Sequence, residues 1–167
     1  MSGKEDPRWL DRTEMTAWLR LIAVAERLPG VLDSQLRRES GLTHYEYQVL
    51  AMLSDAPDRT LRMTYLGLQT NATLPRLSHV VRRLEERGFV VRAVAPEDKR
   101  ASNASLTNAG FDALAAAAPG HLASVRATVF DPLTRTQVEA LSDALAAILT
   151  TVDPAGDAPQ DPRPSTS

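Results

Sequence analysis

Residues 74–110 read LPRLSHVVRRLEERGFVVRAVAPEDKRASNASLTNAG. In the first third of this stretch apolar residues recur every three or four positions, which predicts an amphipathic helix. Gly88 ends that pattern. The short runs at 89–94 and 102–106 then predict two strands, joined by a polar loop at 95–100. A helix followed at once by a hairpin decides the fold.

The predicted helix separates into two faces when it is placed on a helical wheel. One arc, expected to face the core, contains Leu74, Leu77, Val80, Val81 and Leu84. The opposite arc, expected to face solvent, contains Pro75, Arg76, His79, Arg82 and Arg83. Residues 73–100 contain seven Arg and Lys and four Asp and Glu, so the net charge of this segment is seven minus four, or +3. The formal net charge of the whole chain is -2, so positive charge is concentrated here.

Such a face fits DNA, because phosphates require cations and base edges in the major groove require donors on a helix that can enter it. An Arg-rich helical face can equally be a merely solvated surface. Two neighbouring features favour DNA. A short helix and a tight turn precede the segment, and a hairpin with a basic tip follows it.

Outside this stretch the pattern is mostly helical. Pro29-Gly30 interrupts the first helical pattern, and either a kink or a second helix starting at Pro29 is acceptable. Capping-box spacings open two further helices, and Pro119-Gly120 predicts a kink in a third. The expected helices run from about 14 to 40, 43 to 54, 64 to 70, 107 to 128 and 134 to 151, with a loop at 55–62.

The predicted fold class is mainly α with a small β-hairpin wing, a winged helix-turn-helix whose terminal helices form a dimerisation region. The predicted division is a flexible N-terminus at 1–12, a dimerisation helix at 13–40, the DNA-binding region at 41–107, dimerisation helices at 108–152 and a disordered tail at 153–167. The apolar residues expected to be covered between two chains are Met15, Trp18, Leu19, Ile22, Val125, Val129, Leu141, Leu145, Ile148 and Leu149.

Three runs resemble the MarR-type transcriptional regulators. They are residues 42–50, the LExRGxV pattern at 84–90, and the DxR and LTxxG patterns within 98–110. The resemblance covers about Met15 to Thr151, and the last two runs at this separation are its most specific part. Pro75 and Arg76 depart from the commoner Ser/Thr-rich recognition helix, so no operator sequence can be borrowed.

The predicted DNA contacts combine the residues with the resemblance. Arg76 is the candidate for a bidentate guanine contact, with Ser78 and His79 secondary. Arg82, Arg83 and Lys99 are expected to neutralise phosphates. The resemblance implies that Arg100 enters the minor groove and that Asp98 holds it, as suits an Arg at a hairpin tip. The full predicted set is Thr73, Pro75, Arg76, Ser78, His79, Arg82, Arg83, Asp98, Lys99 and Arg100.

Other sites are less well indicated. The resemblance implies a small phenolic or anionic ligand between the dimerisation and DNA-binding parts, and Trp18, His44 and Tyr45 are candidates to line its pocket. Simple packing between helices is the alternative for such residues. The three histidines have no metal-ligand spacing, and no nucleotide or hydrolase motif is present, so we expect no metal, no cofactor and no enzyme activity.

The chain has 167 residues and no cysteine, which excludes disulfides, thiolate zinc sites, iron–sulfur clusters and thiol redox sensing. It shows no secretory signal and no apolar run near the ~20 residues of a membrane span, so we expect a cytoplasmic protein. The expected function is a homodimeric, sequence-specific regulator of transcription, a repressor that reads an inverted repeat in double-stranded DNA. The alternative is a winged-helix protein-interaction module that does not bind DNA.

Overall fold

A computed structural model describes residues 7–96, 98–153 and 156. Its helices are α1 (Arg12–Ser40), α2 (His44–Asp55), α3 (Met63–Gln69), α4 (Leu74–Glu86), α5 (Asn108–Val125) and α6 (Arg135–Val152). Its strands are β1 (Thr60–Arg62), β2 (Val90–Ala95) and β3 (Asp98–Leu106), with a 3-10 turn η1 (Pro57–Arg59) and a π-helical turn η2 (Arg126–Phe130). The predicted fold class is confirmed. Of the flexible N-terminus predicted at 1–12 and the disordered tail predicted at 153–167, residues 1–6, 154–155 and 157–167 lie outside the described residues.

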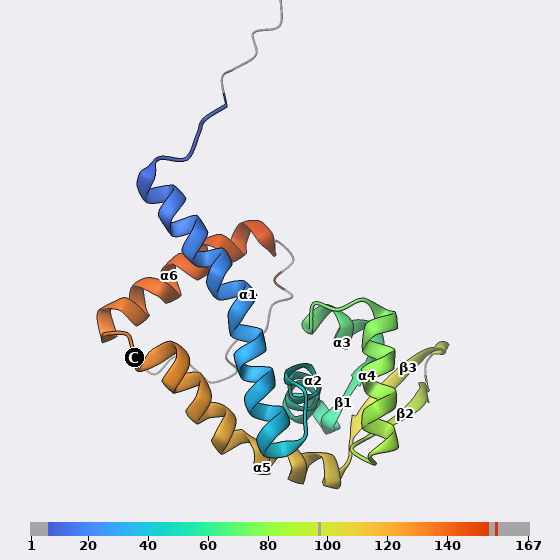
Figure 1. The fold of residues 1–167 in the computed structure, drawn as a ribbon. Coiled ribbons are helices and arrows are strands. Elements are labelled where there is room, and N and C mark those ends of the chain that lie inside the picture. The colour runs from blue at the N-terminus through green and yellow to red at the C-terminus, as the bar shows by residue number, and fades with distance from the viewer. Residues whose placement is uncertain (1–6, 97, 154–155, 157–167) are drawn as a thin grey trace, which may run out of the picture.

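Helix α1 is one continuous helix. Asp11 and Glu14 form a capping box at its start, and Pro29 lies inside it, so no second helix begins there. Gly41 ends α1 with a φ of 65°, a left-handed conformation that glycine adopts without a side-chain clash. The sharp end at Gly41 lets α2 begin only three residues later, beside the last turns of α1 (Figure 1).

The core lies where α2, α3 and α4 meet the sheet and the ends of α1 and α5 (Figure 1). Capping boxes at Thr43 and Thr134 begin α2 and α6, as the sequence predicts. The largest fully buried side chains are aliphatic: Leu36, Leu42, Leu50, Leu53, Leu66, Leu77, Leu84, Val49, Val81 and Val90. Their packing holds α4 against α2 and α3, and leaves the other side of α4 in solvent.

The sheet differs from the expected hairpin in two ways. The strands are antiparallel in the order β1-β3-β2, because Thr60–Arg62 pairs with Asn103–Ser105. The prediction of a loop throughout 55–62 is therefore wrong at its end. The polar loop is also shorter than expected, since Ala95 already pairs with Asp98 and β3 begins there.

Gly110 explains why the wing is followed by the LTxxG pattern. Thr107 caps α5, and its backbone N–H donates to the Phe89 carbonyl at 3.0 Å. A Cβ at Gly110 would collide with that same carbonyl, so the helix can approach the strand only with glycine here. Pro119 lies inside α5, which ends at Val125 and continues as η2.

The outer helices are left largely uncovered. In the described part of the chain, α6 has no buried residue, and the buried residues of α1 all lie in its last third. Exposed apolar side chains on α6 include Leu141, Leu145, Ile148, Leu149 and Val152. They follow helical spacing and form one stripe. Within the described ranges, no helix is long and apolar enough to cross a membrane.

Candidate nucleic-acid interface

Helix α4 presents a polar face beside the wing. Leu77, Val81 and Leu84 are fully buried, as expected, but Leu74 is 46% exposed. The expectation that Leu74 joins the core is wrong, because it is the first residue of α4 and lies only partly against α3, near Gly67. Thr73 is the N-cap, and it makes no side-chain capping bond.

Arg76 lies over the ring of Tyr45, with the guanidinium carbon 4.8 Å from the ring centroid. The Tyr45 hydroxyl shares a 2.9 Å hydrogen bond with the Thr70 hydroxyl at the end of α3. Among the described residues Arg76 makes no ion pair, and it is exposed. Its in-plane N–H donors are free for another acceptor.

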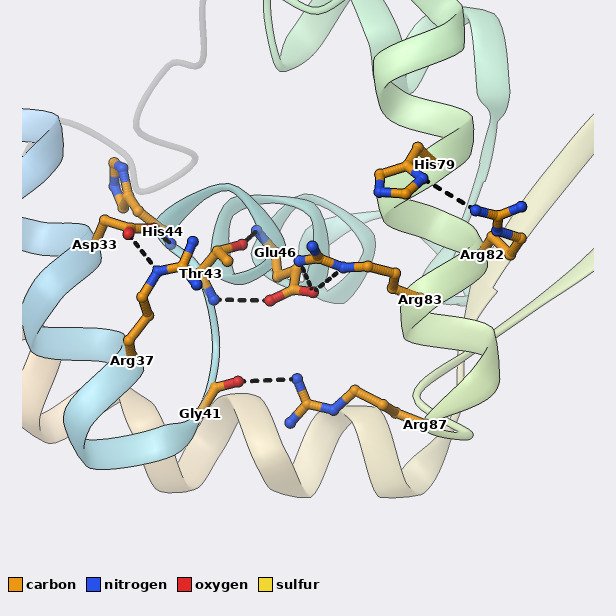
Figure 2. A network of polar contacts seen from close by, with 10 residues as sticks. All are labelled: Asp33, Arg37, Gly41, Thr43, His44, Glu46, His79, Arg82, Arg83 and Arg87. Carbon is orange, nitrogen blue, oxygen red and sulfur yellow. Dashed lines mark hydrogen bonds and ion pairs between the residues drawn. The ribbon is translucent and has the colours of Figure 1, made fainter.

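His79 and Arg82 form a second exposed pair on α4. A terminal nitrogen of Arg82 lies 3.1 Å from His79 Nδ1 (Figure 2). Nε of Arg82 lies 3.9 Å from the Glu86 carboxylate. Ion pairs this exposed are weak, because water and salt screen them. Arg82 can therefore exchange Glu86 for an external anion at little cost.

Arg83 lies at the edge of the solvent face, but its guanidinium turns toward Glu46 on α2, which the sequence did not predict. Its Nε donates to Glu46 Oε1 at 3.1 Å and a terminal nitrogen donates to the same oxygen (Figure 2). The Glu46 side chain is 4% exposed, whereas that of Arg83 is 39% exposed. The wheel places the Cα of Arg83 correctly at the edge of the polar arc, but the long side chain reaches back to α2.

Glu46 joins α2 to α4. Its second oxygen accepts the Thr43 backbone N–H at 2.7 Å, which completes the capping box of α2. Burial on its own raises the pKa of Glu46, but the hydrogen bonds from Thr43 and Arg83 outweigh burial and lower that pKa below its ordinary 4.5. Glu46 is therefore charged at neutral pH. Sequence spacing revealed its capping role and gave no sign of its pairing with Arg83.

Two more of the seven Arg and Lys residues between 73 and 100 donate hydrogen bonds to other parts of the chain. Arg87 donates to the Gly41 carbonyl at 3.1 Å, at the corner between α1 and α2 (Figure 2). Arg92 pairs with Glu85 through contacts of 2.6 Å and 3.1 Å, which fix β2 to the end of α4. These residues stabilise the arrangement of helix and wing, and sequence reasoning did not anticipate that role.

The remaining cations lie on α4 and at the wing. Lys99 and Arg100 are exposed on β3, and no ion pair is found for them among the described residues. Asp98 accepts the backbone N–H of Arg100 at 3.0 Å. Asp98 thus orders the backbone that carries Arg100, and no contact of its carboxylate with the guanidinium is described.

Two hollows lie between α4 and the wing. One, of about 330 Å³, is lined by Pro75, Ser78, His79, Arg82 and Arg92. The other, of about 200 Å³, is lined by Arg62, Met63, Thr64, Leu74, Ser78, Arg92, Arg100, Ala101 and Ser102. Ser78 borders both. The predicted Pro75, Ser78, His79 and Arg82 therefore share one concave surface, with Arg100 at its edge.

The structure does not gather Trp18, His44 and Tyr45 into one pocket within a chain. Trp18 is 22 residues before the end of α1, about 33 Å along the helix axis. Tyr45 points toward Thr70, whereas the His44 ring lies 5.7 Å from the His121 ring of α5. The two α2 residues thus serve different interfaces.

His44, Tyr47 and His121 form a ring cluster between α2 and α5. The rings of Tyr47 and His121 are 4.3 Å apart. Burial lowers the pKa of His121 below 6.5, and the nearby His44 lowers it further. Burial also lowers the pKa of His44, although Asp33 opposes this. Over the described ranges, no group of three or more His, Cys, Asp or Glu side chains is placed to hold a metal ion.

Comparisons with known proteins agree with this geometry. A family model described as MarR family matches residues 40–101. The chain is similar to Sco3205, a MarR family transcriptional regulator from Streptomyces coelicolor whose crystal structure is a complex with DNA. It is 40% identical to Sco3205, with 90% of this chain and 94% of that chain covered and a TM-score of 0.84.

Two further proteins are similar along most of their length. AbsC, also a MarR family transcriptional regulator from Streptomyces coelicolor, is 34% identical, with 87% of this chain and 98% of that chain covered and a TM-score of 0.81. The HTH-type transcriptional repressor YetL of Bacillus subtilis (strain 168) is 28% identical over 120 residues, 72% of this chain and 71% of that protein.

Proposed function

Because the chain belongs to the MarR family of transcriptional regulators, we propose that it binds double-stranded DNA as a sequence-specific homodimer. In this proposal α4 lies in the major groove and the β2–β3 wing contacts the flanking duplex. One observation carries it. Arg76 on α4 and Lys99 and Arg100 on the wing are exposed and have no acidic partner among the described residues, and Arg100 lines a hollow between α4 and the wing.

The roles divide by position on α4 and the wing. Arg76, in the first turn, is assigned to a bidentate guanine contact, because the N-terminal part of a recognition helix meets base edges. Ser78 and His79 border the hollow between α4 and the wing and are secondary candidates. Arg82 and Lys99 are assigned to phosphates, and Arg100 to the minor groove. Arg83 is not assigned to DNA, because its guanidinium is engaged by Glu46.

The dimer is proposed to form through the uncovered helices. The stripe of Leu141, Leu145 and Ile148 on α6 and the exposed Trp18 and Leu19 of α1 form more apolar surface than a monomer usually leaves in water. A two-fold dimer would cover these faces and place two copies of α4 side by side. Their half-site centres would lie about 10–10.5 base pairs apart.

The test is selection of duplexes from a randomised pool by the full chain. The expected product is an inverted repeat with about one helical turn between half-site centres. Arg76→Ala should cost about 1–3 kcal/mol per half-site and relax preference at one base pair. Arg82→Ala should weaken all duplexes alike. A pool that shows no enrichment over many rounds would contradict sequence-specific binding.

Repression and release by a ligand are the finer parts of the proposal. The name of YetL as a repressor supports the first. For the second, a groove of about 870 Å³ between α1 and α5 is the place to look, lined by residues that include Arg38, Gln35 and Gly120. The side-chain carbonyl of Gln35 is buried, and no described group hydrogen bonds to it. Phenolic acids that bind there should raise the melting temperature and weaken binding to the selected duplex.

A further inference from the structure

We propose that Tyr45 is a positioning residue for base readout, whose ring holds the Arg76 guanidinium in the orientation that meets the DNA. This inference rests on the proposed function. It replaces the expectation that Tyr45 lines a ligand pocket. The guanidinium carbon of Arg76 lies over the Tyr45 ring, 4.8 Å from its centroid.

The Tyr45 ring is itself held on two sides. Its hydroxyl shares a hydrogen bond of 2.9 Å with the Thr70 hydroxyl, which also donates to the Leu66 carbonyl at 2.7 Å. Tyr45 is half-buried and packs against the hydrophobic core. The platform under Arg76 is thus part of the rigid body formed by α2, α3 and α4.

Tyr45 and its neighbour Glu46 act on one stripe of α4. Arg76 and Arg83 are seven residues apart, which is two helical turns on the same side. Tyr45 lies under Arg76, and Glu46 pairs with Arg83. Consecutive residues of α2 therefore hold two arginines of the recognition helix, one through a ring and one through a charge.

The ring restricts Arg76 and leaves its donors free. A cation over an aromatic face is attracted by the negative charge of that face. The N–H donors of a guanidinium lie in its plane and remain available for a bidentate contact. An exposed arginine without such a platform would have to give up its rotamer freedom when it binds a guanine. We expect the ring to contribute about two- to fivefold of base discrimination per half-site.

The experiment weakens the negative electrostatic potential on the face of the ring while hardly changing the size of the ring. Phenylalanine and its mono-, di- and pentafluorinated forms are placed at position 45 of the full chain. The same series at Tyr47, whose ring contacts His121, is the matched control. The readout is the affinity ratio between the selected duplex and a duplex substituted at the base pair that responds to Arg76→Ala.

Tyr45→Phe should stay within about twofold of the wild-type ratio, because the ring is kept. The ratio should then fall as fluorination increases, by about two- to fivefold per half-site at the pentafluoro form. Binding to random duplex should stay constant, and so should the ratio in the Tyr47 series. In an Arg76→Ala background the series should have no further effect.

A ratio that stays constant across the series at position 45, in a protein that still selects its duplex, would overturn the inference. If the wild-type chain selects no duplex, the proposed function fails, and this result is distinct. If Tyr45→Phe lowers the melting temperature, a series of fluorinated tyrosines at position 45 replaces the phenylalanine series, because these residues keep the hydroxyl that bonds Thr70. The readout is again the affinity ratio between the two duplexes, with tyrosine as the reference. A ratio that is constant in that series also overturns the inference.

Discussion

Replacing Arg83 with methionine should destabilise the fold, although this residue lies on a helix proposed to bind DNA. Arg83→Met keeps most of the side-chain volume and removes both donors to Glu46 Oε1. The Glu46 side chain, which is 4% exposed beside Arg83, would keep its bond from the Thr43 N–H. A buried charge would thus lose its partner.

The magnitude follows from the burial of the two partners. Removing one partner of a fully buried ion pair costs about 3–5 kcal/mol. The Arg83 side chain is 39% exposed, so water can reach the site and reduce this cost to about 2–3 kcal/mol. Arg82→Met is the matched control. Its side chain is 60% exposed and its pair with Glu86 spans 3.9 Å, so the change should cost less than about 0.5 kcal/mol.

Urea unfolding at pH 7 and at one protomer concentration measures both variants. Because folding lowers the pKa of Glu46, the ionised carboxylate stabilises the fold above pH 4.5. This stabilisation is lost as the pH falls through the pKa of Glu46 in the folded state. The difference between wild type and Arg83→Met should therefore shrink at lower pH. In DNA binding the two variants should differ in the opposite sense. Only Arg82→Met should reduce the slope of log K against log salt, by about one per chain. Equal stability costs for the two variants, or a reduced salt slope for Arg83→Met alone, would refute the reasoning.

Three further predictions test the assembly, the packing and the pH dependence. Leu145→Asp, on the exposed stripe of α6, should convert a sedimenting dimer into monomer or aggregate. Gly110→Ala should cost about 1–3 kcal/mol in urea unfolding because of overpacking, whereas Gly30→Ala, in open space within α1, should stabilise by about 0.5–1 kcal/mol. Burial lowers the pKa of His121 and of His44 below 6.5, so stability should fall as the pH drops through 6.5. His121→Gln should flatten that melting profile; an unchanged profile would count against the ring cluster.

The sequence predicted what local pattern controls. The capping boxes at Thr43 and Thr134, the end of the first helix near residue 40 and the two faces of α4 each depend on residues within a few positions of one another. Local hydrogen bonds and helical periodicity decide such features. The fold class followed from the order of these elements.

Features that depend on distant pairs were missed or misassigned. Strand β1 has only three residues and forms because Thr60 and its neighbours meet Ser105 and its neighbours, more than forty positions away. Arg83 was assigned to solvent, because a helical wheel gives the direction of Cα and contains nothing about Glu46 on another helix. The platform of Tyr45 under Arg76 is a similar case.

The most direct test of DNA binding is the affinity of the full chain for its selected duplex over a series of salt concentrations. With Arg82 and Lys99 of two chains on phosphates, four counterions or more are released, so log K should fall against log salt with a slope of about -3.5 or steeper. Random duplex should show a similar slope at lower affinity, because phosphate contacts carry no sequence information. A chain that binds neither duplex at low salt, or that binds without salt dependence, would contradict the account and favour a winged-helix module that contacts only proteins.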